Sequence, residues 1–155
     1  MSRSKLLKKR KWYQSDGIIR GVMIILGCIF IAASIPKILH PGKFAEIVFN
    51  YQVLPGRLIN LFAIVLPWLE FLTGIMLVFC IWAEGAVIIV NLLLMSFVTV
   101  MAYDLTRGLD VSCGCFSTNI NAGPANFLYL VRDTVFLLMG IFLFFNVVIK
   151  SNSGK

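Results

Sequence analysis

Four apolar segments, each long enough to cross a lipid bilayer, restrict this chain more than any other feature of its sequence. They cover residues 18–35, 58–81, 86–103 and 127–149. A helix needs about 20 mostly apolar residues to span the hydrocarbon, and lipid offers no partners for backbone polar groups, so such segments form helices. Hydrophobic residues make up 59% of the chain and charged residues only 14%, which excludes an ordinary soluble domain. The sequence therefore predicts an all-α membrane protein with a four-helix transmembrane bundle over residues 17–149.

Basic residues predict how this bundle is oriented. Residues 1–16 form a basic tail that contains Arg3, Lys5, Lys8, Lys9, Arg10 and Lys11. Cytoplasmic segments carry the excess of Lys and Arg, so we expect this tail in the cytoplasm and the first apolar segment to be a retained helix. Four spans return the tail 150–155 to the same side, which gives an N-in/C-in topology. The tail is a topology signal that also attracts anionic lipid, and we expect no nucleic-acid partner.

The connection 36–57 faces outward in this topology and contains a further predicted helix. Phe44, Ile47, Val48 and Tyr51 fall at the i, i+3, i+4 and i+7 positions of an apolar helical stripe. A short helix of this kind lies in the membrane interface with its apolar side in the lipid. We therefore predict an interfacial amphipathic helix in the first outward loop.

The second outward connection, 105–125, contains two thiols one residue apart, Cys113 and Cys115. Disulfides persist on the oxidising side of the membrane, and a disulfide within so small a ring is strained and exchanges readily. The other two cysteines, Cys28 and Cys80, lie too far along their helices to reach this pair, and we expect them to be buried apolar packing. The pair predicts a redox dithiol, while a Cu(I) site and an inert structural role stay open as alternatives.

Charged residues inside or next to the spans are the second functional signal. Placing an ionisable side chain inside the membrane costs free energy, so such residues usually mark functional sites. Glu70 lies near the middle of the second span and should face the bundle, either protonated or paired. Asp104 and Arg107 close the third span, and Arg132 and Asp133 lie in the first turns of the fourth. Arg107 or Arg132 could stabilise a cysteine thiolate, Glu70 or Asp133 could carry a proton during exchange with a quinone, and an ion pair that holds the bundle is the alternative.

These features together resemble the MauE family within the DoxX-like membrane proteins. The resemblance rests on Pro67 and Glu70 in the second span, Cys113-Gly114-Cys115-Phe116 in the loop, Arg132 in the fourth span, the exit Ser34-Ile35-Pro36-Lys37 with Phe44, and Tyr51-Gln52-Val53-Leu54-Pro55. It covers about residues 17–149. Ser117 after the cysteine motif and Asp133 after the arginine depart from the residues that are frequent in the family.

The resemblance implies a bacterial inner-membrane protein that faces the periplasm with its cysteine loop. MauE is linked to methylamine utilisation, where it helps a thioredoxin-like partner to form the disulfides of a disulfide-rich client. DoxX-like proteins are linked to quinone-coupled sulfur chemistry, which would place a quinone near Glu70 and Arg132. No resident metal is expected.

The sequence thus predicts a thiol–disulfide oxidoreductase with Cys113 and Cys115 as its catalytic residues. The alternative is a non-catalytic membrane subunit or assembly factor of a larger complex, with the cysteine pair structural or Cu(I)-handling. The direction of electron flow and the identity of the client do not follow from the residues.

Overall fold

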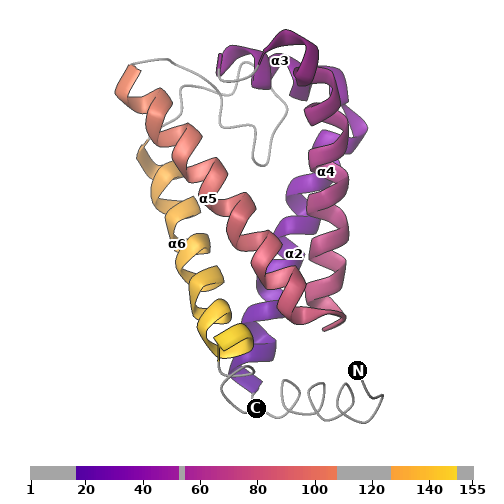
Figure 1. Cartoon of the computed structure of the whole chain (residues 1–155), viewed down its shortest axis with the longest axis vertical. Coiled ribbons are helices and arrows are strands. Elements are labelled where there is room, and N and C mark those ends of the chain that lie inside the picture. The colour runs from indigo at the N-terminus through magenta and orange to yellow at the C-terminus, as the bar shows by residue number, and fades with distance from the viewer. Residues whose placement is uncertain (1–16, 53–54, 108–126, 150–155) are drawn as a thin grey trace.

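The computed structural model describes residues 17–52, 55–107 and 127–149, which are helical apart from short connections (Figure 1). The helices are α2 (Gly17–Leu39), α3 (Pro41–Asn50), α4 (Gly56–Val78), α5 (Ala83–Arg107) and α6 (Phe127–Leu143), which continues as a π-helix over Phe144–Ile149. α2, α4, α5 and the run Leu130–Ile149 are each long and apolar enough to cross a membrane. The predicted all-α class and the four spans are confirmed. The two tails, 1–16 and 150–155, lie outside the described residues.

The first helix continues past the point where the sequence predicts its end. α2 reaches Leu39 and holds Pro36 inside the helix, whereas we placed the end of the span near residue 35. Proline removes one backbone hydrogen bond of the preceding turn but permits helix after it, and here His40 N donates to Pro36 O at 3.1 Å. Lys37 is therefore a helical residue and not part of an outward loop.

The second connection between spans comes earlier in the chain than predicted. The predicted spans 58–81 and 86–103 leave residues 82–85 for the turn between them, whereas α4 ends at Val78 and the turn covers residues 79–82. Cys80 and Trp82 adopt the left-handed conformation, with φ of 53° and 48°. These two residues reverse the chain, so α5 begins at Ala83 as an antiparallel neighbour of α4.

The bundle is built from two closely packed helix pairs, α2 with α4 and α5 with α6. Figure 1 shows the pairs converging at the end that holds the turn 79–82, here called the turn end, and diverging toward α3, here called the α3 end. A Cβ atom on Gly27 would lie 2.8 Å from the Gly74 carbonyl oxygen, so these two glycines let α2 and α4 approach closely. Gly17 and Ile149, the first and last described residues, both lie at the turn end.

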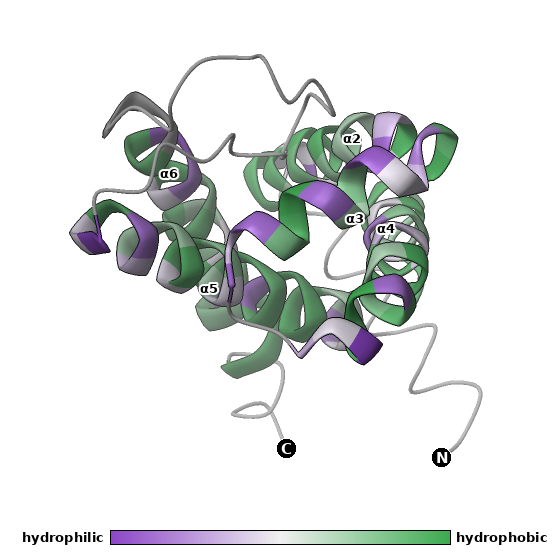
Figure 2. Cartoon of the chain, turned by 90° about the horizontal axis from the view of Figure 1, so that it is seen from above, coloured by the Kyte–Doolittle hydropathy of each residue, from purple (hydrophilic) through white to green (hydrophobic). Residues whose placement is uncertain are grey.

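The spanning helices consist mainly of apolar residues (Figure 2), and many of their large apolar side chains are exposed on the outside of the bundle, as lipid-facing side chains are. Leu92 of α5 is 63% exposed and Leu138 of α6 is 60% exposed. The short helix α3 lies across the α3 end and packs mainly on α4 with Phe44 and Ile47 buried. The predicted helix in this connection is confirmed, and its place in the membrane interface stays a prediction.

Candidate functional site at the α3 end of the bundle

A buried ion pair joins α2 and α4. Lys37 Nζ donates to both carboxylate oxygens of Glu70, at 2.8 and 2.9 Å. The side chains are only 2% and 3% exposed. The prediction that Glu70 faces the bundle is confirmed, and of the two states expected for it the structure shows the paired one.

Lys37 is the partner that the sequence analysis missed. We placed it in the outward connection 36–57, because the first apolar segment ends at Ile35. The signal that could have found it is the spacing of buried positions in α2, since Phe30, Ser34 and Lys37 follow one another at intervals of four and three residues. A helix that continues through Pro36 puts residue 37 on the same buried stripe.

Two aromatic rings complete the surroundings of the Lys37 ammonium. The nitrogen lies 5.2 Å from the ring centre of Phe44 in α3 and 5.0 Å from that of Phe97 in α5. A desolvated cation is attracted to the face of an aromatic ring within about 6 Å. One side chain of α2 thus contacts α3, α4 and α5, and fixes the α3 end of the bundle.

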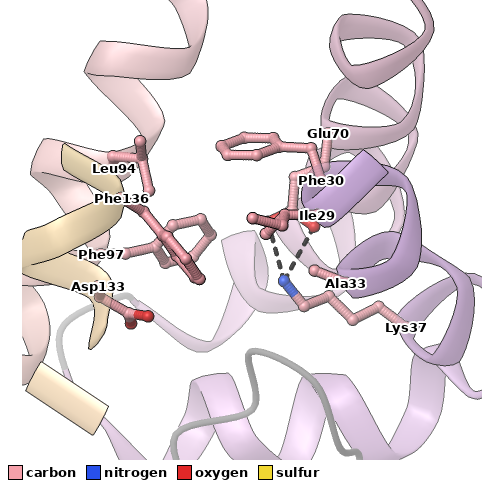
Figure 3. A pocket seen from close by; sticks show the side chains of 9 residues that line it. All are labelled: Ile29, Phe30, Ala33, Lys37, Glu70, Leu94, Phe97, Asp133 and Phe136. Carbon is pink, nitrogen blue, oxygen red and sulfur yellow. Dashed lines mark hydrogen bonds and ion pairs between the residues drawn. The ribbon is translucent and has the colours of Figure 1, made fainter. Parts of the chain in front are cut away.

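A small pocket adjoins this pair and includes Asp133 of α6 (Figure 3). Its lining comes from α2, α4, α5 and α6: Ile29, Phe30, Ala33, Lys37, Glu70, Leu94, Phe97, Asp133 and Phe136. The carboxylate of Asp133 points toward the cavity from the side opposite the ion pair. The free volume is about 40 Å³, which is room for a few water molecules.

Asp133 is also paired with its neighbour on the same helix. Arg132 Nη2 lies 2.9 Å and Nε 3.0 Å from Asp133 Oδ1. The Arg132 side chain is 29% exposed, while that of Asp133 is 5% exposed. The structure therefore brings Glu70 and Asp133 to one pocket, and it pairs Asp133 with an arginine that is partly exposed.

The two charged residues at the end of α5 occupy different environments. Asp104 is buried, and neither carboxylate oxygen has a hydrogen-bond partner among the residues described. Arg107 is exposed, donates to Gln52 Oε1 at 3.3 Å and lies 5.4 Å from the ring centre of Tyr103. Both belong to the last turn of α5, so their predicted place at the end of the third span is confirmed.

The predicted catalytic residues, Cys113 and Cys115, lie outside the described residues. Their connection begins after Arg107 and ends before Phe127, and both of these anchors belong to the α3 end (Figure 1). The chain path therefore joins the cysteine motif to the end of the bundle that holds Lys37, Glu70 and Asp133. A role for Arg107 or Arg132 beside a thiolate stays a prediction.

The two described cysteines carry free thiols. Cys28 is exposed on the lipid-facing side of α2, so the prediction that it is buried is wrong. A small apolar thiol tolerates lipid as well as a protein interior. Cys80 is partly buried in the turn at the opposite end of the bundle from α3, as its position in the sequence predicts. In the described parts of the chain, no group of three or more His, Cys, Asp or Glu side chains is arranged to hold a metal.

Comparison with known proteins agrees with the resemblance drawn from the motifs. A family model described as "Methylamine utilisation protein MauE" matches residues 15–146. The chain is 29% identical to the methylamine utilization protein MauE of Paracoccus denitrificans over 80% of its own length and 67% of the relative's. It is 34% identical to that of Methylorubrum extorquens (63% and 52%) and 30% identical to that of Methylophilus methylotrophus (77% and 64%).

The chain thus spans between about half and two thirds of these relatives' lengths. No solved structure matches it.

Proposed function

Because the chain belongs to the family of the methylamine utilisation protein MauE, we propose that it is an inner-membrane thiol–disulfide redox protein. Its Cys113–Cys115 pair would face the periplasm and serve the maturation of a disulfide-rich protein there. The relatives' names support a role in methylamine utilisation for the family. The thiol chemistry rests on the motif itself.

One observation about the fold carries the proposal. The connection that contains the cysteines starts and ends at the α3 end, and this end also holds the buried charges of Lys37, Glu70 and Asp133. Buried ionisable groups in a membrane bundle mark functional positions. The helix ends that flank the cysteine connection therefore lie at the same end of the bundle as these buried charges, which supports a shared function.

The exchange needs no group beyond thiols and disulfides. A thiolate of the client attacks one sulfur of the Cys113–Cys115 disulfide, and the other cysteine leaves as a thiolate. A second client thiolate attacks the client sulfur of this mixed disulfide and releases the first cysteine. The client loses two electrons and two protons, and the pair gains them. A disulfide of a thioredoxin-like partner restores the pair by the same steps and becomes a dithiol, and the sequence is reversible.

A quinone is the further acceptor that the resemblance to DoxX-like proteins implies. The pocket offers suitable chemistry, because Lys37 can donate to a quinone oxygen and Phe97 and Phe136 provide aromatic walls. Its free volume of about 40 Å³ does not admit a quinone ring in this arrangement. We therefore derive no step through quinone, and the prediction is tested by mixing reduced protein with a soluble quinone and following quinone absorbance.

The decisive experiment is a redox titration of the pair in purified protein. Cys28 and Cys80 are first replaced by alanine so that only the two loop thiols remain. The protein is equilibrated in glutathione buffers, alkylated and analysed by mass spectrometry. We expect a reversible two-electron couple at Cys113 and Cys115, and its absence across the physiological range would end the redox proposal. A Cu(I) titration of the same protein, with Cys113→Ser as control, tests the metal-handling alternative.

Orientation is tested in intact cells with a membrane-impermeant maleimide. A variant that retains only Cys115 should be labelled before the cells are permeabilised, and one that retains only Cys80 should not. Cys80 suits this comparison because it lies at the turn end of the bundle. Labelling in the reverse order would place the cysteine loop in the cytoplasm.

A trap variant identifies the client. Cys115→Ser leaves Cys113 without its resolving thiol, so a mixed disulfide with a periplasmic protein should accumulate. Cys113→Ser is the matched control and shows which cysteine is attacked first. If neither variant captures a protein, the pair does not exchange with a client.

A further inference from the structure

We propose that an open groove between α3 and α4 binds the head group of a phospholipid that carries a primary ammonium, as phosphatidylethanolamine does. The groove is separate from the pocket beside Lys37 and Glu70, and it has no part in the proposed thiol chemistry. Its free volume is about 430 Å³, which falls within the range of about 300–1,000 Å³ that is usual for small-molecule sites.

The lining of this groove combines polar and apolar side chains. Glu46 and Asn50 of α3 and Asn60 of α4 are polar, whereas Phe49 and Ile59 are apolar. Most of the accessible wall is apolar, and the Phe49 side chain is 63% exposed. A polar solute would leave this apolar surface in water, so the lining favours an amphiphile that has one polar group for the three polar side chains.

The polar side chains of the groove favour a cation. Glu46 is the one charged residue among the described residues that line it. In the part of the chain that the structure describes, the side chains of Glu46, Asn50 and Asn60 are exposed and make no hydrogen bond or ion pair. A carboxylate and two amide oxygens are all acceptors, and a primary ammonium has three N–H donors. The two sets of groups are therefore complementary in charge and in hydrogen bonding.

The position of the groove along α4 points to a lipid as the source of this ammonium. The 23 residues of α4 extend about 34 Å at about 1.5 Å per residue, slightly more than the hydrocarbon thickness of about 30 Å. The first turns of α4, which contribute Gly56 and Asn60 to the groove, therefore lie close to the level of the lipid head groups. Arg57, an exposed cation in the same turn as Gly56, is available to the phosphate of the same head group.

The test is lipid binding to the purified full-length chain in detergent, measured by native mass spectrometry. Dioleoyl phosphatidylethanolamine, phosphatidylcholine and phosphatidylglycerol are titrated separately. Phosphatidylcholine keeps the positive charge but has no N–H donor, and phosphatidylglycerol has no cation. We therefore expect phosphatidylethanolamine to bind about tenfold more tightly than either of them. Equal affinities for the three lipids would overturn the proposal.

Two variants place the lipid in the groove. Glu46→Gln keeps the size of the side chain but removes its charge, and should lower the affinity for phosphatidylethanolamine about tenfold. Asn60→Leu removes one neutral acceptor and should lower it about fivefold. Glu84→Gln, in the first turn of α5 at the turn end, is the matched control and should keep the wild-type affinity. A preference that persists in both groove variants would show that the lipid binds elsewhere and would overturn the proposal.

A water-soluble head group separates a lipid from a free amine. Glycerophosphoethanolamine has the same ammonium and phosphate but no acyl chains, so it should bind about tenfold or more weakly than the lipid, because the apolar wall then stays uncovered. Equal binding would show a site for a polar solute and contradict the lipid. None of these measurements involves Cys113 or Cys115, so this proposal and the redox proposal fail separately.

Discussion

Replacing the members of the Lys37–Glu70 pair one at a time and together tests how the α3 end is held. Glu70→Leu leaves an ammonium group that is 2% exposed without its carboxylate. Removal of one partner from a buried pair typically costs about 3–5 kcal/mol. The faces of Phe44 and Phe97 lie 5.2 and 5.0 Å from the Lys37 nitrogen and offset part of this. We therefore expect Glu70→Leu to lower the free energy of unfolding by an amount near the lower limit of this range, about 3 kcal/mol.

The double variant should behave differently. Lys37→Met together with Glu70→Leu removes both charges and retains most of the side-chain volume, and such replacements are often neutral or stabilising. We expect the free energy of unfolding of the double variant to lie within about 1 kcal/mol of that of the unmodified protein, although each single variant is destabilised much more. The coupling energy between the two positions should then be about 3 kcal/mol or larger.

The assay is reversible unfolding in mixed micelles of lipid-like detergent and increasing SDS, followed by circular dichroism. Lys43→Met is the matched control, because Lys43 is an exposed lysine of α3 and its replacement should change stability by less than about 0.5 kcal/mol. If the double variant loses as much as the sum of the single variants, the coupling is zero. The pair would then not hold the bundle as described.

Three further predictions concern the helix contacts, measured by the same assay. Gly27→Ala should lose about 1–3 kcal/mol, because the new Cβ would lie 2.8 Å from the Gly74 carbonyl oxygen. Gly21→Ala, which has no neighbour within 4 Å, should be neutral or slightly stabilising, and equal losses at both positions would contradict the close α2–α4 contact. Asn91→Ala should cost about 0.6 kcal/mol, the average for a hydrogen bond between membrane helices, because Asn91 Nδ2 donates to Gly140 O at 2.9 Å; a neutral result would contradict that bond.

Hydropathy predicts the number and approximate place of the spans, because a segment that crosses the hydrocarbon must consist mostly of apolar residues. It does not predict where helical hydrogen bonding stops. α2 passes through Pro36, and α5 continues through Asp104 to Arg107, because charged or imino residues near a helix end are tolerated once tertiary contacts hold them. The turn at Cys80 is also invisible to hydropathy, since the left-handed conformation there is set by the chain reversal.

The sequence predicts only one member of the buried ion pair. Glu70 stands out because a carboxylate in an apolar segment must face the protein, and this inference needs no knowledge of its partner. Lys37 lies in a segment with a proline before it and polar residues after it, so its sequence neighbourhood resembles a loop. Only the crossing of α2 over α4 shows that the two residues meet. Pair formation between helices depends on packing, which a single sequence does not specify.

Stability alone does not explain why the chain keeps this pair. Apolar side chains of similar volume often replace a buried ion pair without loss of stability, and the glycine contact between Gly27 and Gly74 already brings the helices close. The charges lie at the end to which α5 and α6 bring the cysteine connection, and a third charge, Asp133, faces them across the same pocket. This position of the pair is consistent with a part in the thiol chemistry that we propose for the α3 end. The Lys37→Met/Glu70→Leu variant is therefore the one in which to measure the potential of the Cys113–Cys115 pair, since a stable protein with an altered potential would separate function from folding.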